Sequence, residues 1–205
     1  MSERSNDTAA RIVAAARSRL LSDGYAALST RAVADRAGVP LSQIHYHFGG
    51  KRGLVLALLD DENRRLVARQ RRMYGSEAPL SRRYEQACDL LDEDLASGYV
   101  RVLQEMIAAG WSDDAVARQV LTLLRSWFDL LLDVAREAEQ RFGSLGPFSP
   151  ADIAGLIGLS FLGGEAVILL GDDDWSRGTR TWLRSVGRLI SGLEQAAAAT
   201  ARSPT

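Results

Sequence analysis

The segment between residues 40 and 52 gathers side chains that could bind a nucleic acid. The amide of Gln43 can pair with both N6 and N7 of adenine, and the hydroxyl of Ser42 can reach a base or a phosphate. Lys51 stands where a further helix is expected to begin, and a helix amino terminus with an added ammonium group favours a phosphate. Lys51 is also the only lysine among 25 basic residues. These side chains predict contacts with both the bases and the backbone of DNA.

Two short helices would have to hold these side chains. The first is expected to start after Ser29, a good N-cap residue, and to end near Ala37, where Gly38-Val39-Pro40 forms a tight break. The second is expected to span about residues 41–47, with apolar residues one turn apart that anchor one face and leave the polar face outward. Together with a supporting helix before them, they predict a helix-turn-helix.

Apolar residues recur with helical spacing along the rest of the chain, and no convincing strand pattern is present. The sequence therefore predicts an all-α protein of about nine helices. The first is expected to have Asp7 as its N-cap and Gly24 as its stop. The expected helices span about residues 8–23, 30–37, 41–47, 51–73, 80–96, 99–110, 113–142, 151–170 and 175–199.

The charges are distributed unevenly along the chain. Residues 1–52 carry eight basic and four acidic residues, a net charge of +4, whereas the remainder carries 17 basic and 22 acidic residues, a net charge of −5. This difference fits a polyanion-binding head on a more acidic body, although scattered surface charge gives the same count. The arginine-rich stretch 64–72 and the acidic stretch 85–94 are expected to be solvated helix surface.

Several other classes of protein are disfavoured by the sequence. One cysteine, Cys88, excludes an internal disulfide, and His45 and His47 point to different faces of a helix, so we expect no metal site and no cofactor. No P-loop, G-x-S-x-G, HExxH or dinucleotide fingerprint is present, so we expect no enzyme. No targeting segment is visible. The apolar stretch 153–171 contains Glu165 and is expected to be a buried helix rather than a membrane span.

Residues 28–59 resemble the TetR (tetracycline-repressor) family of bacterial transcription regulators. The resemblance rests on Ala37-Gly38-Val39, on Tyr46-His47-Phe48 and on Lys51, all at the spacing of the family pattern. The chain departs from that pattern at Pro40, where Ser or Thr is usual, and at His45, where Tyr is frequent. These departures affect which bases are contacted rather than DNA binding itself. The expected DNA-contacting residues are Thr30, Arg31, Pro40, Leu41, Ser42, Gln43, His45, Tyr46, His47 and Lys51.

The resemblance implies a cytoplasmic homodimer that binds double-stranded DNA in the major groove. It implies a DNA-binding domain at residues 1–52, linked by helix 51–73, and an effector-binding and dimerisation domain at residues 53–205. The expected function is a repressor released from a palindromic operator when an apolar or amphipathic small molecule binds. The alternatives are a regulator triggered by a protein partner or by no ligand, and a helical enzyme.

The resemblance implies that the last two helices form the dimer interface as a four-helix bundle. Small residues on the first of them permit close approach and support this expectation. Glu165 is expected either to pair with an arginine or to contact the effector. The candidate effector residues are Tyr84, Tyr99, Met106, Trp111, Trp127, Phe128 and Glu165. The candidate interface residues are Gly155, Leu156, Leu159, Gly163, Val167, Leu183, Val186, Leu189 and Ile190.

Overall fold

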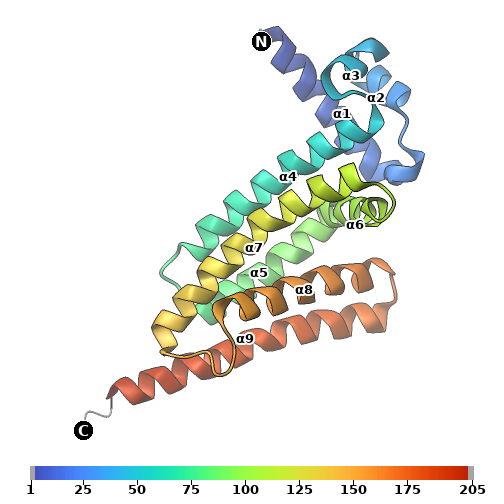
Figure 1. Ribbon diagram of the computed structural model, residues 1–205. Helices are drawn as coiled ribbons and strands as arrows, with labels where there is room; N and C mark the ends of the chain where they lie inside the picture. Colours follow the sequence, from blue (N-terminus) through green and yellow to red (C-terminus); the bar gives the residue numbers. More distant parts are fainter. Residues whose placement is uncertain (1–2, 203–205) are drawn as a thin grey trace. The chain divides into compact units, whose positions relative to one another are not determined.

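A computed structural model describes residues 3–202, and within them the chain forms nine helices and no strand (Figure 1). The predicted all-α class is confirmed, and each predicted helix has a counterpart that differs from it by a few residues at either end. The helices are α1 (Glu3–Ala27), α2 (Thr30–Ala37), α3 (Leu41–Phe48), α4 (Lys51–Tyr74), α5 (Leu80–Ser97), α6 (Tyr99–Gly110), α7 (Asp114–Phe142), α8 (Pro150–Leu169) and α9 (Asp173–Arg202).

The chain divides into two compact units, which do not follow the order of the sequence. The first unit comprises the described residues up to Arg65 together with Ser97–Leu121, and the second comprises Leu66–Ala96 and the described residues from Thr122 onward. Helices α4 and α7 therefore contribute residues to both units. The sequence-based division at residue 52 stays a prediction.

The ends of the first three helices follow from their capping residues. The hydroxyl of Ser29 accepts a hydrogen bond from the N–H of Ala32, and Gly38 and Gly49 close α2 and α3 with positive φ angles of 63° and 69°. Gly24 interrupts α1 with φ 74° and ψ 171°, as a stop residue there predicts. The expected N-cap at Asp7 is wrong, because α1 already begins at Glu3 and the polar residues before Asp7 continue the same helix.

The first three helices pack around a small apolar core. Ile12 and Leu20 from α1, Val33 from α2 and Ile44 from α3 are almost completely buried. Phe48, the second expected anchor of α3, is only half-buried. Burial of one or two residues per helix holds these short segments, since isolated helices of this length are marginal in water.

Helices α8 and α9 form a long antiparallel pair in the second unit (Figure 1). Glycines in α8 permit the close packing: a Cβ at Gly158 would lie 2.5 Å from the ring of Phe128 on α7, and one at Gly164 would lie 3.2 Å from Leu183 on α9. By length and composition α8 is apolar enough to cross a membrane. It buries Phe161, Glu165 and other residues inside the unit, but only 33% of its apolar window is buried, so the expected burial is found in part.

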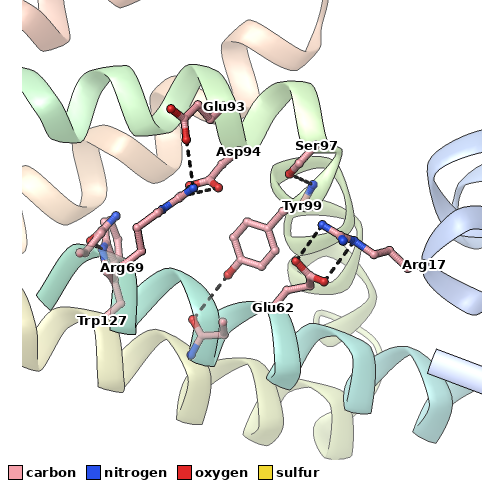
Figure 2. A network of polar contacts seen from close by, with 10 residues as sticks. Arg17, Glu62, Arg69, Glu93, Asp94, Ser97, Tyr99 and Trp127 are labelled. Atoms are coloured by element: carbon pink, nitrogen blue, oxygen red, sulfur yellow. Dashed lines mark hydrogen bonds and ion pairs between the residues drawn. The ribbon is translucent and has the colours of Figure 1, made fainter. Parts of the chain in front are cut away.

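Ion pairs connect α5 to α4 and α9 within the second unit. Arg69 on α4 donates to both carboxylate oxygens of Asp94 on α5, at 2.6 and 2.7 Å (Figure 2). Asp92 accepts from Arg180 Nε at 2.8 Å, and Asp89 accepts from Arg184 Nη2 at 2.7 Å. The expectation that 64–72 and 85–94 are only solvated surface is therefore wrong in part. These contacts join residues far apart in sequence, which helical spacing alone does not reveal.

Candidate nucleic-acid interface and ligand cavity

Helix α3 presents most of its surface to solvent. Ile44 is its only fully buried described side chain, whereas Ser42, His45 and Tyr46 are exposed and Gln43 is half-buried. The exposed fraction of Tyr46 is 77%. The structure thus places the amide and hydroxyl groups of α3 on an outward face, as contact with base edges in a major groove requires.

The other candidate DNA-contacting residues border this face. Pro40 is exposed at the start of α3 in an extended conformation, and Arg31 is exposed on the first turn of α2. Thr30, Leu41 and His47 are half-buried. The predicted set is therefore brought together on α2, the turn and α3, within one compact unit.

Lys51 begins α4 beside an aromatic ring. Its Nζ lies 4.7 Å from the centroid of the Tyr25 ring, close enough for a cation–π interaction. The backbone N–H of Tyr25 donates to Glu105 Oε2 on α6 at 2.6 Å, which fixes the residue that carries the ring. Sequence reasoning found Lys51 but missed Tyr25 and Glu105, because no spacing pattern links the three positions.

A glycine that sequence reasoning missed, Gly53, lies in the first turn of α4, close to the end of α3. A Cβ on Gly53 would lie 1.9 Å from the carbonyl oxygen of Phe48, much closer than two such atoms can approach. Gly49 and Gly50 precede it with φ angles of 69° and 121°, which side chains rarely adopt. This turn sets the position of Lys51 relative to the end of α3. The run of three glycines within five residues was the available signal.

Several arginines of residues 1–52 are engaged in contacts within the protein. Arg11 on α1 donates to the carbonyl oxygens of Ala37 and Gly38, at 2.5 and 3.3 Å, and so caps the end of α2. Arg17 pairs with Glu62 at 3.1 Å (Figure 2). Arg52 pairs with Asp113, which lowers the pKa of that carboxyl group. Arg17 and Arg52 thus have acidic partners outside residues 1–52, so a net charge of +4 overstates the local positive potential.

The second unit contains an apolar cavity of about 370 Å³. None of the 18 described residues that line it is charged. Burial raises the pKa of the Tyr74 and Tyr84 hydroxyls above their ordinary value. The lining comprises Tyr74, Leu80, Tyr84, Leu131, Val134, Ala135, Ala138, Phe142, Leu145, Phe148, Ile153, Leu156, Ile157, Ser160, Val186, Leu189, Ile190 and Leu193.

The structure separates the candidate effector residues into different environments. Tyr84 lines the cavity. Trp127 and Phe128 form an aromatic cluster with Phe161, whose ring centroid lies 6.0 Å from that of Tyr84.

Trp127 also donates from Nε1 to Gln70 Oε1 at 2.9 Å. Glu165 is buried on α8. Tyr99, Met106 and Trp111 belong to the first unit, where Tyr99 and Met106 are buried and Trp111 is exposed. The seven candidate effector residues therefore do not line a single cavity. In the sequence, the residues that line the cavity have the same pattern as core residues, because an apolar stripe on a helix does not show whether a cavity lies against it.

The candidate interface residues lie mainly on one apolar face of α8 and α9. Leu156, Leu159 and Leu189 have exposed fractions of 54, 64 and 70%. Gly163 is exposed, whereas Gly155, Val167, Val186 and Ile190 are intermediate in exposure.

Three positions differ from the expected interface set. Leu183 is buried against Gly164 inside the unit and is not accessible to a second copy. Trp175 and Trp182, which the sequence analysis did not select, are both exposed on α9 and stack edge to face at 6.0 Å.

The first unit contains a helix-turn-helix whose third helix, α3, is exposed, and the second unit is also built of helices. These features define the class of two-unit helix-turn-helix proteins. Residues 12–58 match the family model described as bacterial regulatory proteins, tetR family. The chain is similar to this family over these residues. No curated protein matches the sequence.

Solved structures of low sequence identity have the same fold. A putative TetR-family transcriptional regulator from Rhodococcus sp. is 18% identical, with a TM-score of 0.75 over 90% of this chain and 98% of that one. A putative transcriptional regulator from Saccharomonospora viridis, in complex with choline, is 18% identical, with a TM-score of 0.72 over 88% and 95% of the two chains. FadR from Bacillus subtilis, in complex with stearoyl-CoA, is 17% identical, with a TM-score of 0.68 over 88% and 96%.

Proposed function

We propose that the protein is a homodimeric transcriptional repressor that binds a palindromic DNA operator and leaves it when a small molecule binds the second unit. The observation that carries the DNA-binding part is α3, which buries Ile44 and turns Ser42, His45 and Tyr46 outward. Gln43 would read adenine and Lys51 would hold a phosphate. The match of residues 12–58 to the tetR family model supports the same assignment.

The proposed dimer uses the apolar face of α8 and α9. An exposed apolar surface of this extent is costly in water, and a second copy of the same face would cover it about a two-fold axis. Leu156, Leu159 and Leu189 are its most exposed leucines among the proposed contacts. A two-fold dimer would place two copies of α3 on half-sites about 34–36 Å apart.

Ligand-dependent release follows from this arrangement. A ligand that binds more tightly to one separation of the two DNA-binding heads lowers the affinity of the dimer for an operator whose half-site spacing is fixed.

We assign residues 1–52 to DNA binding and residues 53–205 to effector binding and dimerisation. We further propose that the protein acts in the cytoplasm and is not an enzyme. A regulator triggered by a protein partner or by no ligand remains the alternative, and a thermal-shift screen of small molecules distinguishes it.

A gel-shift experiment tests the proposed DNA binding. The purified protein and the intergenic DNA upstream of its own gene should give a specific complex that weakens as salt is raised. Replacing Gln43 with alanine should reduce discrimination between operator and unrelated DNA by about 1–3 kcal/mol. Gln119, an exposed residue on α7, is the matched control for replacement with alanine.

Absence of any salt-dependent complex with this DNA would contradict the proposal. Full operator discrimination in the Gln43→Ala protein would refute the role of that residue. Equal losses in the Gln43→Ala and Gln119→Ala proteins would show that the effect is unrelated to the face of α3.

A further inference from the structure

The cavity of the second unit has a buried floor and an exposed rim. Tyr84 and Leu131 on the floor are almost completely buried, whereas Leu156, Leu189 and Leu193 have exposed fractions of 54, 70 and 47%. Leu156 and Leu189 also belong to the face of α8 and α9 that we assign to the dimer. The cavity and the proposed dimer interface therefore share side chains.

We infer that this cavity binds an uncharged, apolar small molecule, and that a second copy of the chain closes its rim. The inference rests on the proposed dimer and on the proposed role of a ligand in the second unit. It adds the chemical class of the ligand and the dependence of ligand binding on the oligomeric state.

The lining favours an uncharged ligand because it offers no counter-ion. A buried ionic group without a partner loses much of its hydration energy. The polar groups of the lining are also partly in use: Tyr84 Oη donates to the carbonyl oxygen of Leu183 at 3.0 Å, and Ser160 Oγ donates to that of Leu156 at 2.6 Å. Apolar contact is therefore the main interaction that the cavity provides.

Arg83, a buried cation of the second unit, is already paired. Arg83 is 1% exposed and is held by the backbone carbonyl oxygen of Tyr74 and by Glu137, at 2.5 Å from Nη2 to Oε1. Arg83 itself does not line the cavity. An anionic ligand would have to compete with Glu137 for this guanidinium group, which supports the exclusion of anions.

The volume of the cavity and the exposure of its rim determine what the binding of an apolar molecule requires besides the lining. A cavity of about 370 Å³ lies at the lower end of the range for small-molecule sites. In a single copy, a bound apolar molecule would remain in contact with water at the leucine rim. A second copy that covers these leucines removes that surface from water and so strengthens ligand binding. By reciprocity, the ligand also strengthens the dimer.

Three molecules with the same alkyl chain test the ligand class at pH 8: 1-decanol, decanoate and decyltrimethylammonium. Calorimetry should detect binding of 1-decanol to the full-length protein, and both ions should bind at least about tenfold more weakly. The cavity-filling variant Ala138→Phe should abolish the binding of 1-decanol, because Ala138 lines the cavity. Ala68→Phe, on an exposed position of α4, is the matched control and should bind as the wild type does.

A change outside the cavity tests closure by the second copy. Leu159 is 64% exposed and does not line the cavity, so Leu159→Glu should produce a monomer in sedimentation experiments with the cavity itself intact. Its affinity for 1-decanol should be about tenfold lower than that of the dimer. Gly163→Arg is a second interface variant, since a Cβ at Gly163 meets no atom within 4 Å in its own chain.

Each part of the inference can fail separately. Equal or tighter binding of either ion, or unchanged binding of 1-decanol in Ala138→Phe, would overturn the ligand class. A Leu159→Glu or Gly163→Arg monomer that binds 1-decanol as the dimer does would overturn closure of the rim, and variants that stay dimeric would overturn the assigned face. The proposed DNA binding fails only if the wild type gives no specific operator complex, so the two results are distinguishable.

Discussion

Removing the ammonium group of Lys51 should change how DNA binding depends on salt. Each phosphate neutralised on B-DNA contributes about 0.9 to the slope of log K against log salt concentration. The proposed dimer carries two copies of Lys51, so Lys51→Ala should reduce the magnitude of that slope by about 1.8, and should weaken operator and unrelated DNA alike. Fluorescence anisotropy with a labelled duplex at several salt concentrations measures both quantities.

The ring of Tyr25 should contribute differently, because it positions the charge without carrying one. The Lys51 Nζ lies 4.7 Å from the ring centroid, and an exposed cation–π contact contributes about 0.5–1 kcal/mol. Tyr25→Leu should therefore weaken DNA binding about two- to fivefold per half-site and leave the salt slope unchanged. Tyr25→Phe keeps the ring and should bind nearly as the wild type does.

Arg125, an exposed residue of α7, is the control for loss of one positive charge outside the DNA-binding head. Arg125→Ala should leave the salt slope as it is. The reasoning is refuted if Lys51→Ala and the wild type have the same slope. The positioning role of Tyr25 is refuted if Tyr25→Leu binds DNA as tightly as Tyr25→Phe.

Two further predictions concern stability. Gly53→Ala should lower the free energy of unfolding by about 1–3 kcal/mol, because the new Cβ would overlap the Phe48 carbonyl oxygen, which lies 1.9 Å from its position. A Cβ at Gly192 on α9 meets no atom within 4 Å, so Gly192→Ala should instead raise the free energy of unfolding by about 0.5–1 kcal/mol. Changes of the same sign for the two variants in urea unfolding would contradict this geometry. The hydrogen bond from Arg83 lowers the pKa of Glu137 below its ordinary value of 4.5. The stability that this carboxylate contributes should therefore be fully present above pH 4.5 and be lost as the pH falls through the lower folded-state pKa. If the wild type is more stable than Glu137→Gln by the same amount at every pH, the pairing is disproved.

The fold was predictable because the information for helices is local. Capping residues and apolar spacing of three and four residues predicted all the helices found in the described part of the chain, with Ser29 and Gly38 at the expected ends of α2. Asp7 shows the limit of local rules, since a good capping residue inside a longer helical segment does not start a helix. The spacing of polar and apolar residues on α3 likewise predicted which side chains face outward, because Ile44 alone is fully buried there.

The cavity was not predictable in the same way. Tyr84 was selected as a candidate and does line it, whereas Trp127 and Phe128 pack in an aromatic cluster beside it. An aromatic residue at helical spacing has the same pattern whether it fills a core or borders a space. The difference depends on the distance between helices that are far apart in sequence.

The sequence by itself determined the helical class, the helix-turn-helix and the residues that face outward on α3, because each depends on contacts within a few turns of one helix or between neighbouring helices. Only the tertiary structure decided that Arg11 caps α2, that Tyr25 lies against Lys51, that Leu183 is buried, and that an uncharged cavity shares leucines with the exposed face of α8 and α9. These features arise where segments distant in sequence meet. Their energies depend on the distances and the burial that folding produces.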